Sequence, residues 1–483
     1  MKIKAIIALS ASVAAIGCAS GGLQGTGANR TIAPGVAQQA SQQHPQIIAE
    51  FGGALDGNRN AYVSTVGRKV GAQSGIRSAY TFTALNSPVM NAFAVPGGYV
   101  YVTRQLMGLM NDEAELASVL GHEAGHIAAD HSAGRQNRGL LSQILAAGAA
   151  IVTGSSQLGQ IVGQVAQLNQ LSYSRNQEFE ADTLGIRYMT GAGYDPNAAT
   201  SLLASLGAAT ALEARAAGRN DERSAPAWAQ THPLSADRVA RAAKQAQATG
   251  MAGRGIRNRD QYLAMLDGVI VDDDPRQGVV EGRSFRHPDL RLQFTVPQGY
   301  GIQNGVRAVS ITGSNGQAQF SGGSFNGNLG TYIGQVFQAL GGQQTNIQYA
   351  QPRSTNVNGI PAAYSTARVA TQQGQVDVTV FAYQWDSNTA YHFVTMTRAG
   401  AGNPFESMFG SLGRLTAAQA AAIRPRIIDV VTVRAGDTVQ SLANRMAYND
   451  MKTERFLTLN GLQSNSRLSP GQKVKVVVYG TRT

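Results

Sequence analysis

The sequence predicts an α+β protein made of three folded units. Helical patterns dominate residues 45–250 and are broken by one β-rich passage at residues 80–103. Residues 283–415 alternate apolar and polar side chains in short runs that Gly and Asn turns separate. Residues 429–479 read as strand, helix, helix and strand. At roughly 150 residues per domain, a chain of 483 residues gives each of the larger units enough length to bury its own core.

The composition excludes several classes of protein. Apolar residues make up 43% of the chain and charged residues 14%, which is too hydrophobic for a largely disordered chain. Cys18 is the only cysteine, so any metal must be held by histidines and carboxylates. The net charge of +11 is spread along the chain without a basic helix that carries interleaved aromatics. This pattern argues against nucleic acid as a partner.

The N-terminus has the build of an exported segment. Residues 1–17 carry two lysines, then an apolar run, then small residues, as a signal peptide does. Ala15-Ile16-Gly17 before Cys18 resembles a bacterial lipobox, although Ala15 stands where that motif prefers Leu. The resemblance implies a lipidated Cys18 and, since no Asp follows it, anchoring to the outer membrane of a Gram-negative envelope; ordinary signal cleavage is the alternative. Residues 18–44 lack periodicity and are predicted to be a lipidated tether.

Residues 251–415, which follow the first unit, contain no recognisable catalytic or metal-binding motif. Residues 251–282 lose their helical pattern around an Asp-Asp-Asp-Pro sequence and are predicted to be a linker that follows a short helix. Residues 283–415 are predicted to form an α+β domain of unknown role, with one helix at 330–340. His287, His392, Trp228 and Trp385 show no ligand spacing and are expected to be structural.

The chemistry is concentrated in the sequence His122-Glu123-Ala124-Gly125-His126. The residues before it show helical spacing, and positions i and i+4 of a helix share a face. Both imidazoles can therefore reach one zinc ion, with Glu123 beside them within reach of a water that the metal activates. Two satisfied histidines on a buried helix are the alternative.

A third ligand is predicted on a later helix. The Gly and His that would complete a metzincin motif are absent, since Ala129 and Ser132 occupy those positions. Glu178 and Asp182 lie one helical turn apart, so one can bind the metal while the other accepts the second N–H of a ligand histidine. Glu180 is expected to face elsewhere. A solvated acidic surface is the alternative for this group.

These motifs together resemble the gluzincin zinc metalloproteases that include the HtpX and CAAX prenyl endopeptidases. Four segments in the right order, spread over about residues 45–247, carry the resemblance: His122 to His131, Glu178 to Asp182, Asn91 to Val102, and Thr231-His232-Pro233 with Arg238. The resemblance implies that His122, His126 and Glu178 bind one zinc ion per chain. It also implies that Glu123 is the general base and that Asp182 orients a ligand histidine.

One stretch of the chain bears on membrane insertion. Residues 139–174 contain no charged side chain, but Gln, Ser, Asn and Gly interrupt any run of about 20 apolar residues. We therefore expect helices packed near the active site and no membrane spans. The chain then resembles the soluble, periplasmic, BepA-like branch of the family, without the tetratricopeptide repeats usual in that branch.

Two further histidines are candidates for the site. In the family the histidine at His232 lies near the metal, where it could stabilise the oxyanion or act as a fourth ligand that silences the site. A structural role next to Pro233 is the alternative. His131 lies five residues after His126, off the ligand face of the helix, and is expected to be structural.

A strand is predicted to hold the substrate. Residues 92–102 alternate apolar side chains and include Pro96, which suits an edge strand. In the family such an edge pairs with an extended peptide beside the zinc, which makes Asn91, Ala92, Phe93 and Ala94 the predicted substrate-binding residues. An ordinary hairpin is the alternative.

The C-terminal unit resembles a LysM domain. The sequences Gly436-Asp437-Thr438, Leu459-Asn460-Gly461-Leu462 and Pro470-Gly471-Gln472-Lys473 carry the resemblance over residues 429–479. A LysM domain would bind N-acetylglucosamine polymers such as peptidoglycan. Residues 446–454 depart from the usual loop, so altered or lost sugar binding is the alternative.

The expected function is that of a lipid-anchored zinc endopeptidase in the bacterial periplasm, acting on misfolded or misassembled envelope proteins. A chaperone or scaffold whose metal site His232 blocks is a second expectation. A peptidoglycan cross-link hydrolase is a third and weaker one.

Overall fold

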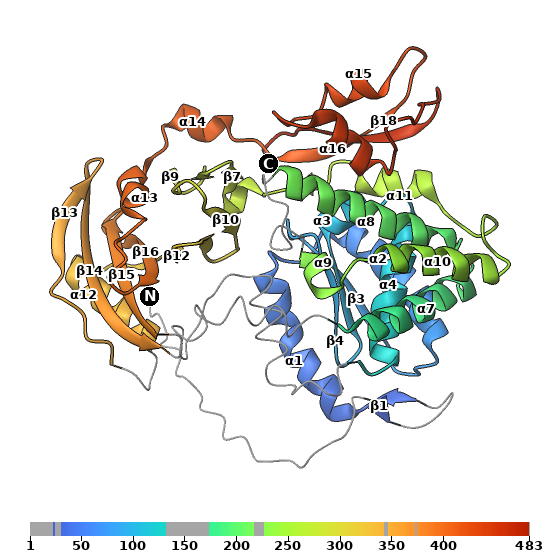
Figure 1. The fold of residues 1–483 in the computed structure, drawn as a ribbon, viewed down its shortest axis with the longest axis horizontal. Coiled ribbons are helices and arrows are strands. Elements are labelled where there is room, and N and C mark those ends of the chain that lie inside the picture. The colour runs from blue at the N-terminus through green and yellow to red at the C-terminus, as the bar shows by residue number, and fades with distance from the viewer. Residues whose placement is uncertain are drawn as a thin grey trace, which may run out of the picture.

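The computed structural model describes residues 23–24, 30–131, 173–216, 227–341, 346–371 and 374–482. Helices and antiparallel or mixed sheets both contribute, which confirms the α+β class. Figure 1 shows a mainly helical unit with the C-terminal module against it, and a separate strand-rich unit at its side. Cys18, the predicted signal peptide and most of the uncharged stretch 139–174 lie outside the described residues. Among the helices that are described, none combines the length and hydropathy needed to cross a bilayer.

The first unit packs helices around a three-stranded sheet of order β3-β5-β4, in which β3 and β5 are parallel and β4 is an antiparallel edge. Helix α4 is buried along its whole length between α2, α7 and α8. Its elements are β1 (Leu23–Gln24), β2 (Thr31–Ile32), α1 (Pro34–Glu50), α2 (Gly57–Gly71), η2 (Ala72–Ser74), β3 (Thr81–Leu85), β4 (Ala92–Val95), β5 (Tyr99–Thr103), α3 (Arg104–Leu109), α4 (Glu113–Ala128), α7 (Arg175–Gly191), α8 (Asn197–Ala216), α9 (Ala227–Thr231) and α10 (Ala236–Ala248).

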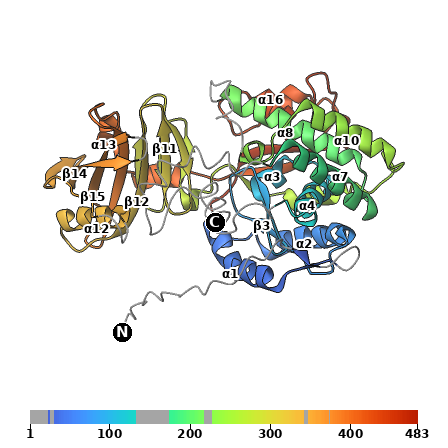
Figure 2. The ribbon, with the colours of Figure 1, turned by 60° about the horizontal axis from the view of Figure 1, so that its bottom comes forward.

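The strand-rich unit is built on a seven-stranded antiparallel sheet of order β10-β11-β12-β16-β15-β14-β13. Helix α12 covers one face, and Figure 2 shows this helix beside β14 and β15. A four-stranded sheet of order β17-β9-β8-β7 supplies a second layer, which shares an aromatic-rich core with the seven-stranded sheet. The elements are η4 (Pro275–Gln277), β7 (Val279–Glu281), β8 (Ser284–His287), β9 (Leu292–Thr295), β10 (Gly301–Asn304), β11 (Val309–Gly313), β12 (Gly316–Ser324), α12 (Leu329–Gly341), β13 (Arg353–Val357), β14 (Ile360–Thr371), β15 (Gly374–Gln384), β16 (Thr389–Arg398), α13 (Glu406–Ser411), β17 (Gly413–Arg414) and α14 (Ala417–Ala422).

Acid should destabilise the strand-rich unit through His392. Burial lowers the pKa of His392 to about 4, and its ring nitrogens contact the Tyr332 and Ser321 hydroxyls. Because the unfolded chain takes up a proton near pH 6.5 and the folded chain only near pH 4, this stability is present above pH 6.5 and is lost as the pH falls from 6.5 to 4. We expect a loss of up to about 3 kcal/mol.

This pH effect can be measured by urea unfolding followed by Trp385 fluorescence in a Trp228→Phe background. The His392→Gln variant should show a shallower fall in unfolding free energy between pH 6.5 and 4 than the parent chain. Identical pH profiles for the two proteins would contradict the assignment.

The C-terminal module has the expected strand, helix, helix, strand order. Its elements are β18 (Arg426–Thr432), α15 (Val439–Ala443), α16 (Lys452–Leu459) and β19 (Lys473–Tyr479). The range 251–282, predicted as a linker, contributes α11 (Arg259–Leu266) and β6 (Ile270–Val271), and β6 pairs with β18 as a third strand. Helix α16 contacts α8, and α11 contacts both β18 and β19. Phe456 and Val474 belong to the same hydrophobic cluster as the core of the first unit.

A polar junction joins the three units where the sequence has its three consecutive aspartates. The Oδ2 atom of Asp272 accepts a hydrogen bond from the Tyr448 hydroxyl of the C-terminal module at 2.9 Å. The backbone oxygen of Asp272 accepts another from the buried Arg104 of α3 at 2.7 Å. Asp273 accepts a hydrogen bond from Asn304 of the strand-rich unit at 3.3 Å. Residues in the range predicted to be a linker therefore join the three units through directional hydrogen bonds.

Candidate metal centre

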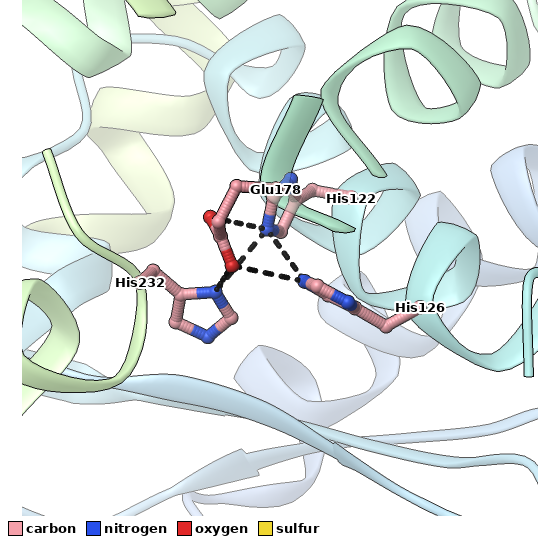
Figure 3. Close-up of side chains that lie close together, drawn as sticks. All are labelled: His122, His126, Glu178 and His232. Carbon is pink, nitrogen blue, oxygen red and sulfur yellow. Dashed lines mark hydrogen bonds and ion pairs between the residues drawn. The ribbon is translucent and has the colours of Figure 1, made fainter. Parts of the chain in front are cut away.

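Helix α4 brings the two motif histidines together. Asp112 caps its start by accepting a hydrogen bond from the Glu115 N–H, and this places His122 and His126 one turn apart on one face. Their Nε2 atoms are 3.0 Å apart, and both side chains are buried (Figure 3). The helical spacing predicted from the sequence thus produces two convergent imidazoles.

Helix α7 supplies the carboxylates. It begins with a capping box in which Ser174 and Gln177 satisfy each other's backbone N–H groups, and this fixes the first turn that carries Glu178. The carboxylate of Glu178 lies beside the two histidines, with Oε1 3.5 Å from Nε2 of His126 and Oε2 3.7 Å from Nε2 of His122 (Figure 3). One turn on, Asp182 Oδ1 lies 3.0 Å from the other nitrogen of His122, Nδ1.

Glycines allow α4 and α7 to approach closely enough for these contacts. A Cβ atom at Gly185 of α7 would lie 2.8 Å from the backbone nitrogen of His122. A Cβ at Gly125 of α4 would lie 3.1 Å from the Ala181 carbonyl oxygen. Any larger residue at Gly185 would push α7 and its carboxylates away from the histidines.

His232 is the fourth group at the centre. It follows α9, and its Nδ1 atom lies 2.9 Å from Glu178 Oε1 and 3.3 Å from His122 Nε2. Its ring stacks on the Trp228 ring, with the ring centroids 4.2 Å apart. Its backbone N–H donates to the Trp228 carbonyl at 2.7 Å. Trp228, expected to be only structural, therefore holds the His232 ring. Its position four residues before His232, about one helical turn, is the sequence feature that could have predicted this contact.

Arg238 of α10 fixes both carboxylates of α7. Its guanidinium donates two hydrogen bonds to Asp182, at 2.8 and 2.7 Å, and Nη1 lies 2.6 Å from Glu178 Oε2. Only 2% of the Arg238 side chain is exposed. A buried bidentate pair of this kind is rigid, so Asp182 is held in place to accept the N–H of His122.

The donor set fits a metal ion. One donor atom from each of His122, His126, Glu178 and His232 lies within 4.8 Å of the other three, and all four side chains are buried. Imidazole nitrogens with a carboxylate are the usual ligands of catalytic zinc. Neither oxygen of the adjacent Glu123 makes a hydrogen bond within the described part of the chain, although the side chain is fully buried.

The carboxylates differ in proton affinity. Burial raises the pKa of Glu123. Burial also acts to raise the pKa of Glu178, but His232 and His126 outweigh it and hold that pKa well below its usual range. For Asp182, hydrogen bonds from Arg238 and His122 outweigh burial and lower the pKa to about 2. The geometry therefore separates two permanently anionic acids from one that can take up a proton.

The single strand predicted over residues 92–102 is wrong: β4 and β5 form a hairpin that turns at Gly97 and Gly98. Its first strand, β4, lies next to Glu123 but is covered. Strand β4 is the edge of its sheet, and the Ala94 N–H faces the Glu123 carboxylate. Asn91, Ala92, Phe93 and Ala94 are all buried. Their role in substrate binding stays a prediction.

His131 and Glu180 lie closer to the centre than the sequence indicated. The Nδ1 atom of His131 is 2.8 Å from Nδ1 of the ligand candidate His126. The Nε2 atom of His131 is 3.2 Å from Glu180 Oε2. Helical spacing does not predict this contact, because position i+5 of a straight helix lies off the ligand face, whereas the chain turns back after α4.

The fold and site define the class: an H-E-x-x-H metallopeptidase in which a glutamate from a later helix lies beside the two motif histidines. Comparison with known proteins agrees. Residues 57–246 match Peptidase family M48 and residues 431–477 match the LysM domain. The chain therefore contains an M48 peptidase domain and a C-terminal LysM domain, as the resemblances implied.

Curated relatives match part of the chain. The chain is 31% identical over 207 residues to the "Mitochondrial metalloendopeptidase OMA1" of Schizosaccharomyces pombe, covering 42% of this chain and 58% of that protein. It is 32% identical over 197 residues to the "Beta-barrel assembly-enhancing protease" of Yersinia pestis, covering 38% of each. The protein of the same name from Escherichia coli K12 is 29% identical over 236 residues, or 46% of each. The chain thus spans between 38 and 58% of the length of these relatives.

Proposed function

We propose that this chain is a zinc-dependent endopeptidase of the bacterial cell envelope that hydrolyses peptide bonds of misfolded or misassembled envelope proteins. The observation that carries the proposal is the buried convergence of His122, His126 and Glu178 with the buried carboxylate of Glu123 beside them. The M48 match and relatives named as metalloendopeptidases or proteases support it.

In the proposed reaction each residue of the centre has one task. A bound zinc ion would lower the pKa of a water towards about 7 and polarise the scissile carbonyl. Glu123 takes the proton of the attacking water and delivers it to the leaving amine, and burial adapts it to this task by raising its pKa. Asp182, held by Arg238, accepts the Nδ1–H of His122 and leaves Nε2 free to bind. The Ala94 N–H at the edge of β4 would pair with an extended peptide beside Glu123.

Removing the metal tests this proposal. Purified chain should cleave casein, lose that activity on treatment with a chelator, and recover it when about one equivalent of zinc is restored. Casein is unfolded and exposes many different peptide bonds, so it can serve as a substrate although the sequence preference of the peptidase is unknown. Cleavage that persists in metal-free protein would contradict a zinc mechanism.

His232 supports a second candidate, a chaperone or scaffold whose metal site is gated. Its Nδ1 atom is close enough to the other donors to act as a fourth ligand, which would exclude water from the metal. Its Nε2 atom lies 3.5 Å from Glu123 Oε1, where it could also stabilise an oxyanion in an open state.

The His232→Ala variant separates these roles. If His232 blocks the site, casein cleavage should rise about tenfold or more in the variant, because the fourth position opens to water. If His232 stabilises the transition state, cleavage should fall about 100-fold, as for loss of one oxyanion donor. The Trp228→Phe variant, which keeps an aromatic ring against His232, is the matched control and should stay near the parent rate.

Location and partners follow from the same proposal. Lipidation of Cys18 would anchor the chain to the outer membrane, and the LysM domain would contact peptidoglycan. Relatives named for β-barrel assembly support substrates among envelope proteins. Cross-link hydrolysis in peptidoglycan is the weaker alternative, and muropeptide release from purified sacculi, lost in Glu123→Gln, would favour it.

A further inference from the structure

The chain reverses direction immediately after the helix that carries the H-E-x-x-H sequence. Helix α4 ends at Ala128, and Asp130 adopts a left-handed backbone with φ of 53°. Asp is among the residues that tolerate this conformation. The His131 N–H then donates to the His126 carbonyl at 3.1 Å, and the His131 ring returns to the side of the His126 ring that faces away from the metal centre.

This turn creates a continuous line of hydrogen-bonding groups that ends at a carboxylate. The Nε2 atom of His126 faces the centre, so a metal there requires the proton of His126 to sit on Nδ1. Within the described residues, the hydrogen-bond acceptor that faces this N–H is Nδ1 of His131, at 2.8 Å, which must then carry its own proton on Nε2. The Nε2–H of His131 faces Glu180 Oε2 at 3.2 Å. Glu180 thereby fixes the tautomer of His131, and His131 fixes that of His126.

The two motif histidines are therefore supported in parallel ways. His122 donates directly to Asp182, whereas His126 would donate to a carboxylate through one intervening imidazole. The His126 ring is also held on one face by Tyr173, whose ring stacks on it at 3.7 Å and 18°. A metal-binding imidazole ordinarily donates its second N–H to such a partner, and the partner raises metal affinity by orienting the ring.

We propose that His131 and Glu180 are positioning residues for the metal centre, acting through His126 to set its tautomer and orientation. This inference rests on the proposed function only in that the centre binds zinc; it does not depend on which substrate is cleaved. It assigns a role to a histidine expected to be structural and to an acid expected to face away from the site.

The inference is tested by the zinc affinities of four variants, each measured by competition with a chromogenic chelator. His131→Phe keeps the ring and removes the acceptor, and zinc binding should weaken about 10- to 100-fold. His131→Asn places an oxygen where Nδ1 was and should restore binding to within about threefold of the parent. Glu180→Gln, at a side chain that is 60% exposed, should weaken binding about threefold without affecting the fold. Glu406→Gln in α13 is the matched control and should bind as the parent does.

A purely structural role for His131 predicts a different result. It would lower the thermal midpoint of the metal-free protein in both His131 variants and leave zinc affinity unchanged, which would overturn the inference. Equal weakening in His131→Phe and His131→Asn would also overturn it, because the acceptor atom would then be irrelevant. If the His131 variants do not fold, unchanged affinity in Glu180→Gln has the same consequence.

The outcome is separable from that of the proposed function. A parent chain that binds zinc but does not cleave casein would refute the peptidase proposal, while the affinity series would still decide the role of His131. A parent chain that binds no zinc would refute both.

Discussion

The Glu123→Gln variant is expected to lose casein cleavage by about 1,000-fold or more while it keeps about one zinc ion per chain. An amide has the shape of the carboxylate but cannot accept the proton of the attacking water. The donor atoms of His122, His126 and Glu178 are untouched by the change. Glutamine also keeps an oxygen that can accept from the Ala94 N–H, so the replacement should leave the fold and the metal site intact.

Three readings on each protein test this expectation: the cleavage rate, the zinc content and the thermal midpoint. Glu406→Gln, the same substitution at an exposed position of the strand-rich unit, is the control and should match the parent in all three. Retention of more than about a tenth of the activity in Glu123→Gln would show that another group is the base. Loss of zinc would show that Glu123 belongs to the ligand set.

Lys475→Met is expected to cost the folded state about 3 to 5 kcal/mol. Lys475 lies on β19 of the LysM domain and is fully buried. Its Nζ atom donates to the carbonyls of Gly108, Leu109 and Met110, at 2.7, 3.3 and 2.6 Å, at the end of α3. Methionine fills a similar volume but leaves these three acceptors without their donor. It also removes a cation that acts electrostatically on the buried Glu115 of α4.

Urea unfolding at pH 6 measures this cost, followed by Trp228 fluorescence in a Trp385→Phe background. Burial lowers the pKa of Lys475 to about 7, so the side chain carries its charge at that pH. Lys473→Met is the matched control on the same strand; its side chain is 36% exposed and pairs with Asp260, so the loss should stay below about 1 kcal/mol. Equal effects of the two substitutions would mean that the LysM domain does not stabilise the peptidase unit.

The Lys475 contact fixes the LysM domain against the peptidase unit, and this limits how the domain could act in the proposed function. The peptidase unit and the LysM domain share one hydrophobic cluster and one sheet, through β6, so they form a single body. The last of the carbonyls that Lys475 holds, that of Met110, lies two residues before Asp112, which caps the helix that carries His122 and His126. If the LysM domain binds peptidoglycan, the metal centre would then be held at a set orientation to the wall.

Local patterns in the sequence predicted the parts of the site that local geometry controls. The i, i+4 spacing of His122 and His126, and of Glu178 and Asp182, places each pair on one helix face wherever the helices lie. That the two faces meet depends on the close approach at Gly125 and Gly185, which only the assembled fold reveals.

The remaining features depend on contacts between distant segments or on irregular backbone. The role of His131 follows from a left-handed residue at Asp130, which helical spacing does not predict. The docking of the LysM domain depends on Lys475 and on a two-residue strand, β6, too short to show a pattern. Asp272 was predicted to lie in a linker because the helical pattern breaks up around it, but its partners come from α3 and from Tyr448, 176 positions along the chain.

The most direct test of the central claim is anomalous diffraction at the zinc absorption edge from crystals of the full chain purified without added metal. The account predicts one anomalous peak per chain, about 2.0 to 2.2 Å from the Nε2 atoms of His122 and His126 and from a carboxylate oxygen of Glu178. A peak at other residues, or none in protein that cleaves casein, would contradict it.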